Sequence, residues 1–153
     1  MAIEDWIDDV VQVAGSVKSH EKGIIRAYQV VSKAEFPESI TVRPCVLVYP
    51  TSVVFQLSAG MSKEIWRGVC EFYLFPNKNK SNIPTIVKYY RRIRDAFAGA
   101  VTLGGKVDHF CFAPGENSLE FSVLQYGDEA EGHGITVRWE VKADVSSEVT
   151  VGG

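Results

Sequence analysis

The sequence reads GITVRWEVK from Gly134 to Lys142, and this stretch does most to decide the fold. Apolar and polar side chains alternate along it, which is the two-residue period of a strand with one buried face and one face in water. A strand of this kind belongs to an antiparallel sheet, and its apolar face must be covered by another layer. The residues that we expect in the resulting core include Trp6, Phe121, Val137 and Trp139.

Several other segments have strand composition, because they are rich in β-branched and aromatic residues and are bounded by turn residues. They are Val42 to Tyr49, Ser52 to Leu57 as its expected partner, Ile65 to Phe75, Lys106 to Phe112, and Ser118 to Tyr126. The longest, Ile65 to Phe75, is partly apolar on both faces. We therefore expect one face to meet a helix and the other to meet a neighbouring subunit.

Two segments have the apolar period of helices that lie on a core. The first runs from Ile3 to Ala14, and its early acidic residues suit the positive end of the helix dipole. The second runs from about Thr85 to Ala98, after a proline that a first helical turn tolerates. Its expected inner stripe is Ile86, Val87, Tyr90, Ile93 and Phe97. A weaker helical pattern covers Ile24 to Val31.

The order of elements is thus helix, helix, strands, helix, strands. Helices gathered on one face of a mainly antiparallel sheet fit this order best, so the predicted fold class is α+β. A chain of 153 residues, 46% apolar and 23% charged, is sufficient for one domain with its own core. We expect this domain to span residues 1–143 and a flexible polar tail to follow over residues 144–153.

Charge and hydropathy restrict the class of partner. The formal net charge of −3 favours neither a nucleic-acid binder nor a membrane-surface protein. The first residues are acidic and lack the basic start and apolar run of a secretory signal. No stretch approaches the ~18 apolar residues of a membrane helix, so we expect a cytosolic protein without membrane contact.

Residues capable of covalent or metal chemistry are present, but not in the spacing that such chemistry needs. Cys45, Cys70 and Cys111 are odd in number and lie in apolar runs, which predicts buried thiols without disulfides. His109 and Cys111 would share a strand face, yet no Cys-x-x-Cys or second close ligand pair accompanies them. Neither a P-loop nor a dinucleotide fingerprint occurs. We therefore predict no catalytic residues, no cofactor and no metal.

Positive charge is concentrated locally on the second predicted helix and just before it. The residues concerned are Lys78, Lys80, Lys88, Arg91, Arg92 and Arg94. A solvated helix face is the commonest origin of such a run, and an interface with an acidic partner, or with DNA passing close by, is the alternative. Tyr89 and Tyr90 beside the arginines favour the interface, because Tyr and Arg are enriched at interface cores.

Taken in order, the segments also form a recognisable series. It consists of the helix Ile3–Ala14, Gly23-Ile24 to Tyr28, Phe36-Pro37-Glu38-Ser39-Ile40, Arg43-Pro44-Cys45-Val46-Leu47-Val48-Tyr49-Pro50, the strand Trp66–Phe75, the helix Pro84–Ala98, Leu103-Gly104-Gly105, Gln125-Tyr126-Gly127, and Gly134-Ile135-Thr136-Val137. This series resembles the tail-terminator, or tail-completion, proteins of long-tailed bacteriophages, of the lambda minor tail protein U type. The resemblance spans about Ile3 to Lys142 and lies in layout more than in a sharp motif; the acidic, glycine-rich loop Gly127 to Gly134 departs from it.

The resemblance implies an α+β subunit of a hexameric ring, which is a structural virion protein and not an enzyme. The ring would cap the tail tube at the head-proximal end of the tail, stop tube polymerisation and join the tail to the head-completion or neck proteins. Its partners would be copies of itself, the tail tube protein and a head-completion protein. Genomic DNA would pass through the lumen without specific recognition, and assembly would take place in the host cytoplasm.

A closed ring needs two different surfaces on each subunit, because its contacts are heterologous. One candidate is the exposed side of the long strand, with Arg67, Glu71 and Tyr73. The other is the basic side of the second helix and its preceding loop, formed by Lys78, Lys80, Lys88, Arg91 and Arg92. We expect this basic surface to pair with an acidic loop of the next subunit, formed by Asp128, Glu129 and Glu131.

Other functions fit the same sequence. The first alternative is a different phage neck component, such as a head–tail connector. The second belongs to another class: a small-molecule-binding α+β module with an apolar pocket between helix and sheet. An enzyme is the third. The native mass of the purified protein would distinguish the ring-forming hypotheses from a monomeric binding module.

Overall fold

The computed structural model describes residues 3–17, 26–29, 39–40, 43–58, 61–115 and 117–144. These residues form helices and strands in an order close to the predicted one. The elements are α1 (Ile3–Gly15), β1 (Arg26–Gln29), β2 (Cys45–Ser58), β3 (Met61–Tyr73), the short 3-10 helix η1 (Lys80–Asn82), α2 (Ile83–Ala98), β4 (His109–Phe112), β5 (Leu119–Leu124) and β6 (Gly132–Asp144).

The strands form one six-stranded sheet in the order β1-β2-β3-β6-β4, and β5 also pairs with β6. β2, β3 and β6 are antiparallel along most of their length. β4 and β5 lie one after the other along the far edge of β6, where both are antiparallel to it. Only β1, among the described strands, runs parallel to its neighbour, β2. The predicted α+β fold with a mainly antiparallel sheet is confirmed.

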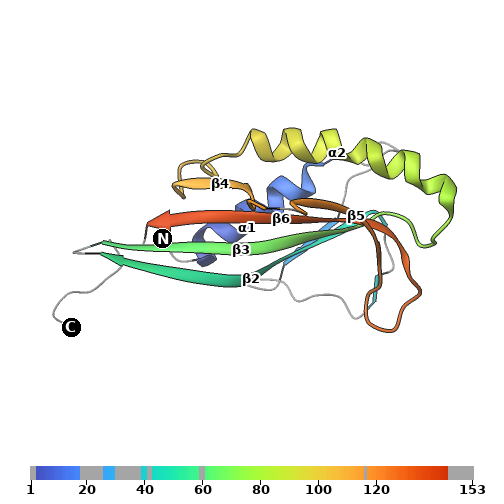
Figure 1. Ribbon diagram of the computed structural model, residues 1–153, viewed down its shortest axis with the longest axis horizontal. Coiled ribbons are helices and arrows are strands. Elements are labelled where there is room, and N and C mark those ends of the chain that lie inside the picture. Colours follow the sequence, from blue (N-terminus) through green and yellow to red (C-terminus); the bar gives the residue numbers. More distant parts are fainter. Residues whose placement is uncertain are drawn as a thin grey trace.

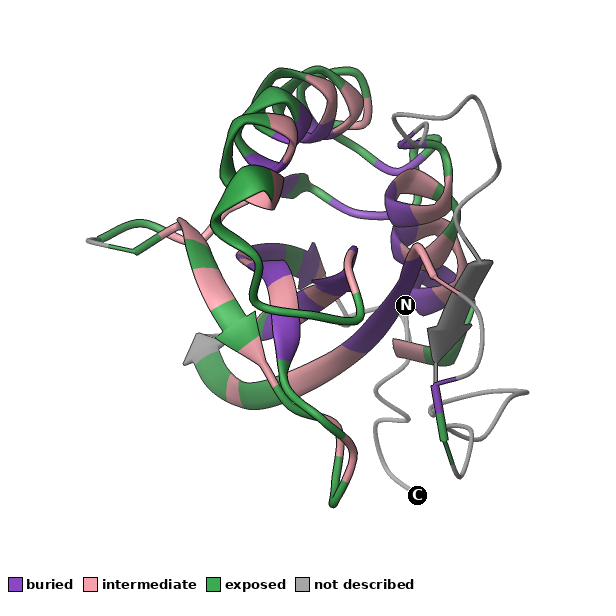
Figure 2. Cartoon of the chain, turned by 90° about the vertical axis from the view of Figure 1, so that its right-hand side faces the viewer, coloured by how far each residue is buried: buried purple, intermediate pink, exposed green. Residues whose placement is uncertain are grey.

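Both helices pack on the same face of the sheet, and α2 lies along the top of it in Figure 1. Trp6 of α1 and Phe97 of α2 belong to one buried cluster that also contains Phe72 of β3 and Trp139 of β6. In Figure 2 the buried residues gather where the helices and the sheet face one another, and the outer turns of α2 are exposed. The main core is therefore a layer between the helices and the sheet, as predicted.

Three tryptophans form the centre of this core. Trp6 meets Trp66 and Trp139 edge-on, with ring centroids 6.1 and 6.0 Å apart. Trp6 and Trp139 are fully buried, which confirms the expectation for both, and Val137 is buried as well. The indole of Trp139 lies directly over Gly68 of β3, and a Cβ at that position would occupy the space of its ring. Gly68 is thus required by the close approach of a side chain from the next strand.

Two predicted elements differ from the structure at the sheet edge. The helical pattern from Ile24 to Val31 is wrong for Arg26–Gln29, which form β1, and the rest of that segment lies outside the described residues. The backbone of β1 pairs with Cys45–Val48, so a tertiary partner overrides the local period. The two strands expected before and after Pro50 are one continuous β2, with a bulge at Thr51 where the register shifts between Pro50 and Ser52. Bulges and edges are the places where a strand tolerates proline.

The structure also corrects which side chains face the core. Tyr89, and not Tyr90, lies in the inner stripe of α2, while Val87 and Tyr90 are 49% and 45% exposed. Phe121 was expected in the core but is 47% exposed, because an apolar hollow between the start of α2 and β5 leaves it partly uncovered. β6 ends at Asp144, the residue at which the flexible tail is predicted to begin. Residues 145–153 lie outside the described residues.

Candidate interaction surfaces

The thiols and histidines do not gather into a chemical site in the described part of the chain. Cys45 and Cys70 are buried, and burial raises the pKa of Cys45 to about 11 and raises that of Cys70 further. Burial also raises the pKa of the half-buried Cys111, with Glu140 nearby adding to the effect. Among the described residues no group of three His, Cys, Asp or Glu side chains is placed to hold a metal ion. All three thiols are therefore protonated and weakly nucleophilic at neutral pH.

The face of the sheet that points away from the helices carries paired polar groups. Arg67 of β3 lies opposite Glu140 of β6, and its Nε donates to Glu140 Oε2 over 3.1 Å. The Tyr49 hydroxyl of β2 donates to Glu71 Oε1 over 2.8 Å. Glu140 is only 5% exposed, so its carboxylate depends on Arg67 for compensation. Two of the predicted interface residues, Arg67 and Glu71, thus already have partners in their own subunit.

Tyr73, the third predicted residue of the long strand, is not at the surface. It is 4% exposed and belongs to a second, smaller core with Ile40, Cys45 and Leu47, on the side of the sheet opposite the helices. The ring of Tyr126 packs edge-on against it with centroids 6.0 Å apart. The exposure expected of Tyr73 is therefore wrong, because the segment after β5 folds back over it.

The acidic loop is tied to its own chain at two points. The backbone N–H of Ile40 donates to Glu129 Oε1 over 2.6 Å, and an Arg43 nitrogen lies 3.8 Å from the other carboxylate oxygen. Glu131 accepts from Lys78 Nζ over 2.7 Å. Asp128 is exposed. The structure therefore brings the predicted acidic loop and the Lys78 loop together, but within one subunit.

The basic side of α2 carries both engaged cations and cations without an ion pair among the described residues. Lys80, Lys88 and Arg91 are exposed, and none has an ion-pair partner in the part of the chain that the structure describes. The Arg92 guanidinium lies 5.3 Å from the centre of the Tyr89 ring. Arg94 lies 5.5 Å from that of Tyr90 and forms an ion pair of 3.3 Å with Asp95. Lys88 and Arg91 are thus the cations of α2 best able to meet another molecule.

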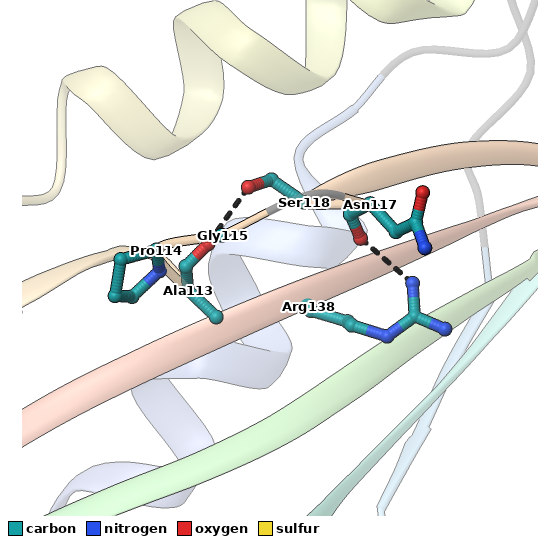
Figure 3. A pocket seen from close by; sticks show the side chains of 6 residues that line it. All are labelled: Ala113, Pro114, Gly115, Asn117, Ser118 and Arg138. Atoms are coloured by element: carbon teal, nitrogen blue, oxygen red, sulfur yellow. Dashed lines mark hydrogen bonds between the residues drawn. The ribbon is translucent and has the colours of Figure 1, made fainter.

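A polar hollow of about 210 Å³ lies at the turn between β4 and β5. Figure 3 shows Arg138 extending from β6 toward this turn, where its Nη1 donates to the carbonyl oxygen of Asn117 over 2.7 Å. Arg138 also forms an ion pair of 3.2 Å with Glu120. The Ser118 hydroxyl donates to the carbonyl of Ala113 over 2.7 Å. The polar groups that line the hollow already bond to other groups of the same chain, so the hollow offers little free charge to a ligand.

An apolar groove lies between the start of α2 and the edge strand β5. Four half-exposed side chains form its walls, namely Ile83 and Val87 from α2 and Phe121 and Val123 from β5. Ile86, Ser122, His133 and Gly134 complete the lining, and the hollow measures about 240 Å³. We call this feature the α2–β5 groove. Ser122 Oγ and His133 Nδ1 are buried without a hydrogen-bond partner among the described residues.

A second apolar surface lies on the outer part of the β2–β3 hairpin. We call Ser52–Gln56 of β2 and Lys63–Arg67 of β3 the β2–β3 arm. Phe55 is 63% exposed and Val54 is 55% exposed, on opposite faces of the arm. Figure 1 shows the hairpin running past both helices at the left, whereas β5 and the start of α2 lie at the right. The two apolar surfaces are therefore at opposite ends of the subunit.

Sequence reasoning missed both of these surfaces, although each left a signal. Val53, Val54 and Phe55 are consecutive apolar residues, so a two-sided strand must expose at least one of them. Val87 and Phe121 were assigned to the core because periodicity shows which residues share a face and not how far that face is covered.

Comparison with known proteins yields no matching family model and no matching curated protein sequence. Within the described residues, neither helix has both the length and the apolar character needed to cross a bilayer.

Proposed function

We propose that this chain is a ring-forming structural subunit, specifically a tail terminator of a long-tailed bacteriophage. The observation that carries the ring is the pair of exposed apolar surfaces at opposite ends of one subunit, the β2–β3 arm and the α2–β5 groove. Exposed apolar patches commonly mark protein interfaces. Two unlike surfaces are also what a closed ring of identical subunits requires, because each contact joins different patches.

The assignment to the tail terminator comes from the order of segments along the chain. In this proposal a homo-hexameric ring caps the tail tube, stops its polymerisation and presents its other side to a head-completion protein. The virion is its site of action, and neither a cofactor nor a membrane takes part. The exposed cations Lys88 and Arg91 supply positive charge at the surface of α2, suited to an acidic neighbour.

A small-molecule-binding module is less well supported. Ligand pockets usually measure about 300–1,000 Å³ and enclose most of the ligand. The α2–β5 groove measures about 240 Å³, which suits one inserted side chain better than a metabolite.

Native mass spectrometry over a range of protein concentrations tests whether the ring forms. Electron microscopy with polymerised tail tube protein tests where the ring binds on the tube. We expect rings that bind only one end of each tube and stop elongation when added early. A protein that stays monomeric at all concentrations, alone and with tubes, would contradict the proposal. Binding to head proteins but not to tubes would instead indicate the head–tail connector.

A further inference from the structure

We propose that the β2–β3 arm of one copy docks into the α2–β5 groove of the next, with Phe55 inserted in the groove and Glu64 beside Arg91. This inference rests on the proposed function, since it names the surfaces by which the ring would close. Each of its parts is a feature of a single subunit, and the occupant is a second copy of this chain.

The arm presents an apolar anchor and an acid on the same face. Phe55 lies directly opposite Glu64 in the β2–β3 ladder, so their side chains project from the same side of the hairpin. Among the described residues Glu64 accepts only a long bond of 3.4 Å from Trp66 Nε1, which leaves its carboxylate with acceptor capacity for another molecule. A phenylalanine that is 63% exposed on a projecting hairpin has the form of an interface anchor.

The groove has the size and character to receive that anchor. Its hollow of about 240 Å³ has apolar walls on both sides. An engineered apolar cavity of about 150 Å³ already accommodates a benzene molecule, so a phenyl ring fits a groove of this volume.

The arm and the groove also each lie at an open strand edge. β1 pairs only with Cys45–Val48 of β2, and within the described residues no strand pairs with the outer edge of β2 beyond Val48. An edge of this kind carries free N–H and C=O groups. β5 likewise has no described strand on its outer side, so the arm would meet a second open edge beside the groove.

The spacing of charge and anchor matches on the two surfaces. Cβ atoms directly opposite in an antiparallel pair are about 4.5–5.5 Å apart, which places Glu64 one such step from Phe55. Residues four apart on a helix have Cβ atoms about 5–6 Å apart, which places Arg91 at a similar distance from Val87 on the groove wall. Inserting Phe55 beside Val87 therefore brings Glu64 to Arg91, an exposed cation without an ion-pair partner in the described part of the chain.

The contact has to form between copies and not within one. The arm and the groove lie at opposite ends of the long axis in Figure 1, so an arm cannot reach the groove of its own subunit. Because the two surfaces differ, repeating the contact produces a ring if the rotation closes and a filament if it does not. This is the geometry that a terminator ring requires.

The anchor is tested by comparing two alanine variants of the same arm. Phe55→Ala should raise the concentration needed for ring formation at least tenfold in native mass spectrometry or analytical ultracentrifugation. Val54→Ala is the matched control, because Val54 is similarly exposed on the opposite face, and it should change that concentration less than twofold. On the other surface, Val87→Glu should abolish rings, and the circular dichroism spectrum should stay that of the wild type for all three variants.

Mixed-chain crosslinking tests the pairing itself. A Glu64→Cys chain is mixed with an Arg91→Cys chain, both also carrying Cys111→Ser, with oxidised glutathione as the oxidant. We expect disulfide-linked heterodimers from this mixture. A mixture with Lys63→Cys in place of Glu64→Cys should yield few, because Lys63 projects from the other face of the arm.

The outcomes separate this inference from the proposed function. Rings that form normally from Phe55→Ala, with no Glu64–Arg91 heterodimer, would overturn the arm-in-groove contact and leave the ring itself standing. A loss of binding to tail tubes without a loss of ring formation would overturn it too, because the arm would then serve a different partner. A wild-type chain that never assembles would overturn both the arm-in-groove contact and the proposed function.

Discussion

The two faces of the sheet come from the same strands but are stabilised in different ways. Along β3, the side facing the helices carries Trp66, Cys70 and Phe72. The opposite side carries Arg67 and Glu71, each of which is bonded to a residue of a neighbouring strand. The face toward the helices, the covered face, is stabilised by shape and close packing. The face away from them, the open face, is stabilised by pairing each charged group with a partner. Substitutions on the covered face should therefore cost more stability.

The largest effect is expected at the centre of the covered face. Trp139→Ala should lower the free energy of unfolding by about 3–5 kcal/mol, because it removes a fully buried indole and leaves a cavity. Urea denaturation measures the loss. Phe121→Ala is the control on the same side of the sheet and should cost less than about 1 kcal/mol, since Phe121 is 47% exposed. Equal losses from the two variants would contradict the difference in coverage.

The second, smaller core on the side away from the helices, which contains Cys45, should make stability depend on pH. Burial raises the pKa of Cys45 from 9.0 to about 11, so the unfolded chain loses this proton at a lower pH than the native protein. Stability should therefore fall as the pH rises from about 9 to about 11, by at most ~1.4 kcal/mol for each pH unit. Urea denaturation across this range should show a shallower decline for Cys45→Ala. Identical declines would place Cys45 in contact with water.

Gly68 offers a more local test of the covered face. Gly68→Ala should lower the free energy of unfolding by about 1–3 kcal/mol, because the new methyl group would occupy the space of the Trp139 ring. Combining it with Trp139→Phe should cost less than the sum of the two single changes, since the smaller ring leaves room. Thermal unfolding of all three variants measures this coupling. Strict additivity would show that the two residues do not compete for space.

On the open face, the critical pair is Arg67 and Glu140. Arg67→Met should lower the free energy of unfolding by about 1–2 kcal/mol, because it leaves the buried Glu140 carboxylate without its partner. The loss stays moderate because water can reach the half-exposed Arg67 site. Adding Glu140→Gln should recover part of this loss by removing the uncompensated charge. Chemical denaturation of the single and double variants provides the comparison. A double variant weaker than Arg67→Met alone would show that Glu140 stabilises the fold by other contacts.

The smallest effect is expected at the ion pair between Lys78 and Glu131. Both side chains are about half exposed, so Lys78→Ala should lower the free energy of unfolding by less than ~1 kcal/mol. Hydrogen exchange should nevertheless become faster in the loop around Glu131, which this contact holds. Lys80→Ala, a nearby lysine without an ion pair among the described residues, should leave that loop unchanged.

The parts of this molecule that follow from local periodicity could be predicted from the sequence. The alternation from Ile135 to Val141 and the stripe of α1 correctly located the covered face. β1 could not be found in this way, because four residues become a strand only through their pairing with Cys45–Val48. The bond from Ile40 to Glu129 joins residues 89 positions apart, a distance over which no spacing rule operates.

Errors at the candidate site have a common origin. Periodicity assigned Phe121 and Val87 to a face correctly, but the extent to which α2 covers that face depends on where the helix begins and how it crosses the sheet. For Tyr89 and Tyr90, adjacent residues on a helix differ by about 100° around the axis, so a small rotation decides which one is buried. The exposed ends of otherwise covered faces are thus where surfaces for other molecules arise, and they are the hardest to infer.

The bulge at Thr51 has a consequence for which length changes this chain can tolerate. Before it, Pro50 pairs with Gly68, and after it, Ser52 pairs with Arg67, so Thr51 is one residue more than the ladder needs. Side chains alternate between faces, so the later part of β2 keeps its orientation only if the residue removed is the extra one. Deleting Thr51 would remove the bulge and leave Ser52 opposite Arg67 and Phe55 opposite Glu64. A three-nucleotide deletion at this codon could thus shorten the chain while the exposed aromatic ring stays on its side of the hairpin.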